Sequence, residues 1–318
     1  MLNRHPVLVD VGASGNAPRV WQPIARHSMY LGFDPDQREP HETSGGAFHK
    51  SIVLNKAITE RADAKEVHFY FTKQPHCSST LRPDAQSLSE YLFADLFAVQ
   101  RESTVSGETL NSVIDRLGLQ RIDWLKIDTQ GTDLRIWDSL SQELRSHPLA
   151  LDIEPGLAAA YEGEDMFVDA HRQLTSNGFW LSNLNVRGAV RMRKKSLDAV
   201  LQAGSGLTAP FLEAAAKKSP MWCEARYLRT IDSLVATHAT KSDFVMLWIF
   251  AMLDDQAGFA LDVVLQTEES FGNDEMTILM RAASITQLGC GKVRTLVPRI
   301  KNLLPTPVKL WIKAAIGR

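Results

Sequence analysis

The sequence predicts an α/β fold, a Rossmann-like, doubly wound and mainly parallel sheet that is followed by a smaller C-terminal helical domain. Two observations lead to this prediction. Residues 7–11 form a short apolar run that enters a glycine-containing turn, and strand-like runs then alternate with helix-like segments as far as residue 186. Such alternation is typical of a parallel sheet with helices on both faces, where ligands bind at the carboxyl ends of the strands.

The turn after the first strand has the pattern Asp10-x-Gly12-x-x-Gly15. Glycines at such places adopt backbone angles closed to other residues and let a ligand lie on the main chain. A dinucleotide-binding turn would read G-x-G-x-x-G. The acid two residues before the first glycine instead favours a ligand with an ammonium group, such as S-adenosylmethionine. A tight turn without a ligand is the alternative for this motif by itself.

A helix is expected over 18–27 and a second strand over 29–36, with Asp34 at the end of that strand. An acid at this place accepts hydrogen bonds from the ribose hydroxyls of a cofactor. Its distance from Gly12, about 20 residues, fits that role. A turn-forming aspartate before Pro35 is the alternative. A third strand over 50–54 is followed by a turn around Asn55.

Residues 66–73 alternate between apolar and polar side chains, which predicts a strand with one exposed face. The loop that follows, 74–83, contains His76 and is rich in hydroxyl groups. Such a loop is suited to hold substrate or cofactor over the edge of the sheet, and an ordinary turn-rich connection is the alternative. An extended stretch and a helix over 108–117 come next.

The strand at 122–128 carries Lys126 and Asp128 on the same face as Trp124, because side chains alternate along a strand. A strand that is buried on both faces is almost wholly apolar, so the presence of two charged side chains in this strand indicates a structural or functional role for them. Asp128 at the carboxyl edge of the sheet is a candidate for function, since buried acids at such edges often take part in chemistry.

A helix over 132–144 leads to a strand at 148–155, which places Asp152 and Glu154 on one face. If this strand neighbours the strand at 122–128, Lys126 is expected to pair with one of these acids. Glu154 then lies at the same edge as Asp128. A structural ion pair without a catalytic part is the alternative.

The remaining chain divides by character. We assign 1–190 to the Rossmann-like domain, 191–230 to an extension with a strand at 224–230 that completes the sheet, and 231–318 to the helical domain. The predicted helices of this helical domain break at three glycines, which are Gly258, Gly272 and Gly289.

The 318 residues are enough for one large domain with an appendage, and a net charge of -2 gives no reason to expect nucleic-acid binding. The three cysteines are scattered without metal-ligand spacing, so no metal site is predicted and a reducing, cytoplasmic setting is expected. The sequence has no secretory signal region and no apolar run of about 20 residues that would span a bilayer.

The C-terminal segment is basic, since every charged residue after Glu275 is a lysine or an arginine. Lys309 and Lys313 lie one turn apart beside Trp311, as in an interfacial helix. Peripheral contact of residues 305–318 with an anionic membrane surface or a lipid-linked glycan is therefore a hypothesis. A helix that is docked on the domain with its lysines in water is the alternative.

Six stretches in order resemble the FkbM-type family of S-adenosylmethionine-dependent methyltransferases, over residues 6–185. They are Val-Asp-Val-Gly-Ala-Ser-Gly at 9–15, Gly-Phe-Asp-Pro-Asp at 32–36, Asn-Lys-Ala-Ile at 55–58, Cys-Ser-Ser at 77–79, Ile-Asp-Trp-Leu-Lys-Ile-Asp-Thr-Gln-Gly at 122–131 and Asp-Ile-Glu-Pro at 152–155. The resemblance implies methyl transfer, usually to a hydroxyl oxygen of a sugar, a polysaccharide or a glycolipid intermediate.

The resemblance to this family also implies cofactor contacts at Asp10, Gly12 and Asp34 and an active-site edge at Asp128. One departure stands out, because Gln130 occupies a position where the family usually has an acid. An amide keeps the hydrogen bonding of an acid but removes its charge. Metal assistance or acid-base work at this position is therefore left open.

The predicted function is that of an S-adenosylmethionine-dependent O-methyltransferase with a carbohydrate or glycolipid acceptor. The predicted cofactor-binding residues are Asp10, Gly12, Ala13, Gly15, Asp34 and Asn55. The predicted catalytic residues are Asp128, Lys126, Glu154 and His76. Gln130 keeps open a catalytically silent binding module of the same family, and the absent G-x-G-x-x-G speaks against an NAD-dependent oxidoreductase.

Overall fold

The computed structural model describes residues 4–36, 47–204 and 206–300, and only the backbone of 290–300. The chain forms two compact units, Met1–Ala239 and Thr240–Arg318. The short helix α8 (Ile231–Ala236) belongs to the first unit, although the sequence predicts that the helical domain begins at 231. The segment 305–318, which carries the membrane hypothesis, lies outside the described residues.

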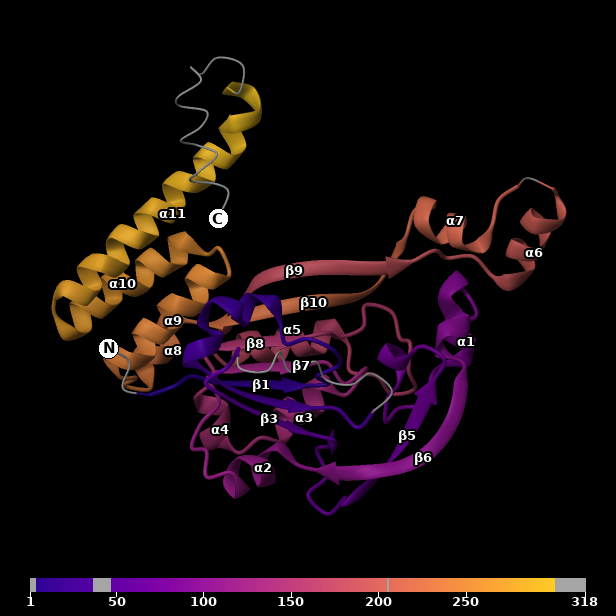
Figure 1. Cartoon of the computed structure of the whole chain (residues 1–318), viewed down its shortest axis with the longest axis horizontal. Coiled ribbons are helices and arrows are strands. Elements are labelled where there is room, and N and C mark those ends of the chain that lie inside the picture. The colour runs from indigo at the N-terminus through magenta and orange to yellow at the C-terminus, as the bar shows by residue number, and fades with distance from the viewer. Residues whose placement is uncertain (1–3, 37–46, 205, 301–318) are drawn as a thin grey trace. The chain divides into compact units, whose positions relative to one another are not determined.

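The first unit contains a seven-stranded sheet in the order β3-β2-β1-β7-β8-β10-β9 (Figure 1). Its strands are β1 (Val7–Val11), β2 (Met29–Phe33), β3 (Lys50–Leu54), β7 (Trp124–Ile127), β8 (Ala150–Ile153), β9 (Phe179–Ala189) and β10 (Ser219–Arg229). The first five strands in this order are parallel, and β10 runs antiparallel to both β8 and β9. This confirms the predicted Rossmann-like sheet, and β10 inserts between β8 and β9.

One face of the sheet is apolar because alternate side chains of each strand point to it. Leu125, Ile127, Leu151 and Ile153 lie in the main core on this face. Buried side chains of four helices complete that core. These helices are α2 (Leu110–Arg116), α3 (Asp133–Ser139), α4 (Gln142–Ser146) and α5 (Phe167–Ser176). Figure 1 shows α2, α3 and α4 on one side of the sheet.

The single helix predicted over 132–144 is wrong, because α3 and α4 are separate. Leu140 has extended backbone angles after α3. The hydroxyl of Ser141 then accepts a hydrogen bond from the N–H of Leu144 and so caps α4.

The opposite face of the sheet is covered at β1 and β7 by η1 (Arg19–His27), which is a 3-10 helix instead of the expected α-helix. Pro23 lies inside η1 and lacks the N–H that an α-helix interior needs. Trp21 packs edge-on against Trp124, with ring centroids 6.0 Å apart.

A second sheet of three strands, β4 (Ala57–Ile58), β5 (Glu66–Thr72) and β6 (Val99–Glu108), stands beside the first. The strand β6 extends to Glu108, so the helix predicted from 108 begins later, after Thr109 caps α2. Between β5 and β6 the chain forms η2 (Pro75–Cys77), α1 (Ala85–Leu88) and η3 (Leu92–Phe97). The helices α6 (Lys194–Gln202) and α7 (Ala209–Ala215) lie at the far end of the β9–β10 hairpin (Figure 1).

The second unit contains α9 (Lys241–Leu253), α10 (Ala257–Phe271) and α11 (Glu275–Ile300). The predicted breaks at Gly258 and Gly289 are wrong because both glycines lie inside helices, whereas Gly272 ends α10 with φ +81°. A glycine costs a helix only about 1 kcal/mol relative to alanine, which packing can offset. In the described part of the chain no helix is long and apolar enough to cross a membrane.

Candidate active site

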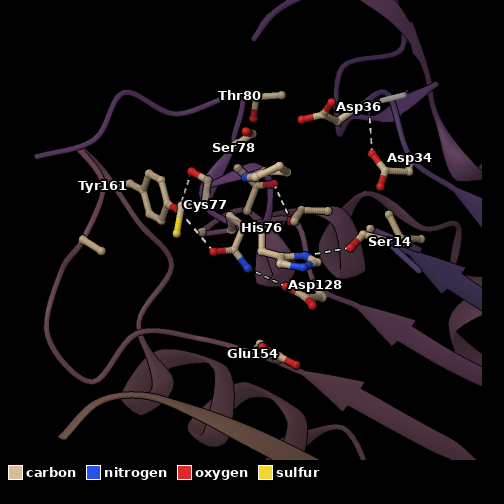
Figure 2. A pocket seen from close by; sticks show the side chains of 18 of the residues that line it. Ser14, Asp34, Asp36, His76, Cys77, Ser78, Thr80, Asp128, Glu154 and Tyr161 are labelled. Atoms are coloured by element: carbon tan, nitrogen blue, oxygen red, sulfur yellow. Dashed lines mark hydrogen bonds between the residues drawn. The ribbon is translucent and has the colours of Figure 1, made fainter. Parts of the chain in front are cut away.

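A cavity of about 440 Å³ lies at the carboxyl ends of the central strands. Gly12, Asp34, Asp128 and Glu154 line this cavity, and each residue follows a different parallel strand. Figure 2 shows the three acids around the cavity. Its volume falls in the range of about 300–1,000 Å³ that is usual for small-molecule sites. The sheet edge that the sequence predicts as the site is therefore hollowed.

The segment between β5 and β6 supplies another wall of the cavity. His76 and Cys77 of η2 and Phe93 and Phe97 of η3 line it. The hydroxyl of Ser79 donates a hydrogen bond of 2.7 Å to the carbonyl oxygen of Gln130, which fastens this loop to the end of β7. The polar loop at 74–83 thus lies at the sheet edge, where we expect it.

Gly12 is required by a contact between main chains. Its φ is +84°, and a Cβ atom there would lie 1.8 Å from the carbonyl oxygen of Asp128. The N–H of Asp128 donates a hydrogen bond to the carbonyl oxygen of Val11, at 2.8 Å. The glycine therefore lets the ends of β1 and β7 approach each other. Gly15 has φ +74° and open space around it.

Asp10 lies below the turn and does not line the cavity. Its side chain is buried, and its carboxylate accepts hydrogen bonds from Lys126 Nζ at 3.2 Å and from the hydroxyl of Tyr30 at 3.1 Å. The charge expected to face a ligand ammonium group is thus matched by a lysine. Asp10 therefore links β1 to its neighbours β7 and β2 through Lys126 and Tyr30.

Lys126 lies among acids from three strands. Its Nζ is 3.2 Å from Asp10 Oδ1 and 3.4 Å from Asp128 Oδ2. Burial lowers the pKa of Lys126, but the carboxylates of Asp10, Asp128 and Glu154 together raise that pKa well above its usual value. Lys126 is therefore a permanent cation that holds acids in place, and it does not line the main cavity.

The predicted pairing of Lys126 with an acid of the neighbouring strand is wrong for Asp152. The strands β7 and β8 are neighbours, and Lys126 and Asp152 are aligned in register. However, Asp152 forms a two-pronged ion pair with Arg226 of β10, with nitrogen–oxygen distances of 2.7 and 3.0 Å. The antiparallel strand β10 supplies this partner, which the sequence does not reveal.

Asp34 lines the cavity and is almost fully buried. Its Oδ1 accepts a hydrogen bond of 2.7 Å from the N–H of Asp36. Burial raises the pKa of Asp34 to about 6, the charges of Asp36 and Asp128 add to this rise, and the N–H of Asp36 opposes it. A ligand that donates hydrogen bonds to Asp34 would therefore favour its ionised form.

Asp128 and Gln130 form a hydrogen-bonded chain with Tyr161. The amide of Gln130 donates to Asp128 Oδ1 at 2.7 Å, and its Oε1 accepts from the Tyr161 hydroxyl at 3.1 Å. The same hydroxyl lies 2.9 Å from the carbonyl oxygen of Cys77, so its one proton is shared between these two acceptors. Gln130 has φ +60°, an uncommon angle for a residue with a side chain. The amide at this position therefore orients the carboxylate of Asp128.

Asp133 ties the ends of β7 and β8 together from the start of α3. It accepts hydrogen bonds from the N–H and hydroxyl of Thr129 and from the N–H of Glu154, at 2.7 to 2.9 Å. Burial, with a further contribution from the negative charge of Asp128, raises the pKa of the Glu154 side chain to about 9, although the charge of Lys126 opposes this rise. Without a ligand, Glu154 therefore holds a proton at neutral pH.

His76 lies at the cavity wall, beside Ser14 of the β1 turn (Figure 2). Its Nδ1 and the hydroxyl of Ser14 are 2.7 Å apart. The imidazole ring has two nitrogen atoms that can donate or accept a proton. The structure thus brings His76 to the same cavity as Asp128.

The predicted residues therefore separate into two groups. Those at the cavity are Gly12, Asp34, His76, Asp128 and Glu154, and those that do not line it are Asp10, Ala13, Gly15, Asn55 and Lys126. Asn55 is exposed beyond β3, while the N–H of Ala13 donates to the carbonyl oxygen of Phe33.

Several cavity residues are absent from the prediction. Among them are Asp36, Cys77, Tyr161 and Trp222. The sequence could have indicated two of them as site residues: Asp36 through the second acid of Asp-Pro-Asp at 34–36, and Cys77 through the Cys-Ser-Ser stretch. Tyr161 and Trp222 follow no local pattern in the sequence.

Among the described residues, no group of three or more His, Cys, Asp or Glu side chains is placed to hold a metal ion. In the comparisons with known proteins, the family model described as the methyltransferase FkbM domain matches residues 30–203. No curated protein and no solved structure matches the chain.

Proposed function

Since the chain belongs to the FkbM methyltransferase family, we propose that it transfers a methyl group from S-adenosylmethionine to a hydroxyl oxygen of a carbohydrate or glycolipid acceptor. The observation that carries this proposal is the acid-lined cavity at the carboxyl ends of the strands, to which Asp34, Asp128 and Glu154 of the matched residues contribute. Bound S-adenosylmethionine supplies an electrophilic methyl group on a positively charged sulfur.

The charges that line the cavity favour a cationic ligand. Asp34, Asp36 and Asp128 line the cavity, and Lys56 is the sole lysine or arginine among its described lining residues. The ammonium of Lys56 is already 2.5 Å from the carboxylate of Glu108. A pyrophosphate would meet repulsion in this cavity, whereas a sulfonium and an ammonium group would be attracted. The lining thus supports S-adenosylmethionine over NAD.

Asp34 and Asp36 are the residues that would hold the ribose side of the cofactor. Asp34 follows β2, and an acid at this position binds ribose hydroxyls in Rossmann-like folds. Asp128, after β7, and His76, in η2, line the same cavity and would be the groups that meet the acceptor.

We assign His76 to accept the proton of the acceptor hydroxyl and Asp128 to orient the acceptor. Lys126 and Gln130 both donate hydrogen bonds to the carboxylate of Asp128 and fix its position. Most of the rate enhancement can come from such positioning, because methyl transfer needs an in-line oxygen in a dry pocket. General base catalysis by a histidine adds about 10²- to 10⁴-fold.

A carbohydrate acceptor agrees with the aromatic side of the cavity. Trp222 and Phe93 are stacked, with ring centroids 6.3 Å apart and planes 6° from parallel. Flat aromatic faces beside carboxylates such as Glu164 match a ligand that has apolar ring faces and polar edges.

Transfer of a labelled methyl group to polysaccharide and glycolipid fractions tests this proposal. Wild-type protein should label a fraction, and the label should resist mild alkali, because a methyl ether resists alkali and a methyl ester does not. His76→Gln should slow the labelling about 100-fold. His68→Gln, a change at an exposed histidine of β5, should leave it unchanged. Label lost in alkali would contradict a hydroxyl acceptor.

A further inference from the structure

A row of polar side chains crosses the face of the sheet that η1 only partly covers. Asp10, Lys126, Asp152, Arg226 and Asn183 occupy aligned positions on five successive strands of the sheet order, from β1 to β9. Aligned residues on neighbouring strands point to the same face. The charges along this row alternate in sign.

Such a row does not suit a face that is buried beneath an apolar helix. Strands buried on both faces are almost wholly apolar. The other face fits that rule, because Leu125, Leu151 and Ala225 lie there in the main core. The side chains of Asp152 and Arg226 keep 15% and 19% of their surface exposed. This half of the face is therefore built for polar surroundings.

A second cavity of about 400 Å³ lies over this half of the row. Asp152, Arg226, Asn183 and Asn185 line it, and Pro18 at the start of η1 contributes to its edge. Asn183 and Asn185 are exposed side chains of β9. The cavity therefore offers amide donors and acceptors beside an ion pair.

The second cavity borders the proposed active site directly. Glu154 and Glu224 line both cavities. The carboxylate of Glu224 accepts hydrogen bonds from Asn185 at 2.9 Å and from Arg187 at 2.9 Å. A ligand that extends past these two glutamates from the active site would enter the second cavity.

Apart from Glu154, the acidic and basic residues that line the second cavity are paired within the protein. Arg226 pairs with Asp152, Arg187 pairs with Glu224, and Lys126 pairs with Asp10. A charged ligand would have to compete with these pairs. A neutral ligand that is rich in hydroxyl groups can donate to the paired carboxylates and to the Asn183 amide without disturbing them.

We infer that this cavity is an acceptor subsite that binds neutral sugar units next to the unit that is methylated. The inference rests on the proposed methyl transfer and adds a location and a charge class for the acceptor. The acceptor is then an oligosaccharide or a longer glycan, because the two cavities hold different units of one chain.

Calorimetry with neutral and acidic oligosaccharides tests the subsite. The probes are hexasaccharides of glucose, mannose and xylose and a uronic acid hexasaccharide, each added to protein that is saturated with S-adenosylhomocysteine. At least one neutral probe should bind. Asn183→Leu, which removes the amide at nearly constant size, should weaken this binding about tenfold, and Asn183→Trp should abolish it by filling the cavity. Gln100→Leu changes an exposed amide of β6 outside both cavities and should have no effect.

The possible outcomes separate this inference from the proposed function. Binding of S-adenosylhomocysteine with no binding of any neutral probe would overturn the subsite alone. Neutral binding that is equal in wild type and both Asn183 variants, or binding of the uronic acid probe alone, would also overturn it. Absence of S-adenosylhomocysteine binding in the wild type would overturn the proposed function itself.

Discussion

The side-chain amide of Gln130 donates a hydrogen bond of 2.7 Å to the carboxylate of Asp128. An acid at position 130 would place two carboxyl groups together, and one of them would have to take up a proton or be repelled. The amide instead keeps one carboxylate at this place. Gln130 therefore does not remove the acid of the site, which weakens the case for a catalytically silent module.

Gln130→Glu should destabilise the protein at high pH. Repulsion from Asp128 raises the folded-state pKa of the pair, so this variant is most stable at low pH and loses stability as the pH rises through that value. We expect a loss of about 1–3 kcal/mol at pH 8 and a smaller loss at pH 5. Urea unfolding at both pH values measures this difference. An equal loss at both pH values, or a similar loss in Gln100→Glu, would contradict the account.

Lys126→Met should be among the most damaging single changes in the sheet. It leaves the carboxylates of Asp10 and Asp128 without their shared cation, and breaking a buried pair in this way costs about 3–5 kcal/mol. Removal of one of these charges by a second change, Asp10→Asn, should restore part of the stability. Lys65→Met, a change at an exposed lysine, serves as the control in thermal unfolding. A mild effect of Lys126→Met would show that the acids do not depend on it.

Gly12→Ala and Gly15→Ala separate a steric requirement from a conformational one. Both glycines have positive φ, but only at Gly12 would a Cβ atom strike the Asp128 carbonyl. Gly15→Ala should cost about 1–2 kcal/mol through its backbone angle alone. Gly12→Ala should cost more and should also displace Asp128, with loss of cofactor binding. Equal effects in unfolding experiments would refute the main-chain contact.

Glu154→Gln should stabilise the ligand-free protein at alkaline pH. Burial raises the folded-state pKa of Glu154 to about 9, far above its ordinary value. A raised pKa means that the contribution of the group to stability is present at acidic pH and is lost as the pH rises through about 9. The amide copies the protonated form, so the melting temperature should fall less steeply with pH in this variant.

Differential scanning calorimetry between pH 6 and pH 9.5 measures this slope. Glu162→Gln, at an exposed glutamate of the neighbouring loop, is the matched control and should follow the wild type. A Glu154→Gln curve parallel to that of the wild type would mean that Glu154 is already ionised when the cavity is empty.

The strands, the β1 turn and the acids at the sheet edge could be predicted because each depends on residues that are close in sequence. The pattern around Lys126 and Asp128 shows two charges in an apolar strand, and of these two residues Asp128 lines the cavity. The partners of these charges could not be predicted, because they depend on strand order. β1 and β8 both flank β7, yet Lys126 pairs with Asp10 of β1, while Asp152 of β8 turns to Arg226 of β10.

The residues that line the cavity away from the sheet could not be predicted from the sequence either. Tyr161 reaches Gln130 from a loop that has no regular period, and Trp222 reaches the cavity from β10, far along the chain. The 3-10 form of η1 and the break between α3 and α4 depend on Pro23 and on the Ser141 cap, which a helix-like pattern of apolar residues does not reveal.

Calorimetric titration with S-adenosylhomocysteine, compared with NAD, tests the central claim most directly. We predict micromolar binding of S-adenosylhomocysteine and none of NAD. Binding should weaken as the pH falls below about 6, because burial raises the pKa of Asp34 to that value and the protonated acid accepts fewer hydrogen bonds from ribose. Asp34→Asn should bind about tenfold more weakly at pH 8 and lose this pH dependence. Binding of NAD alone, or of neither ligand, would contradict the proposed methyl transfer.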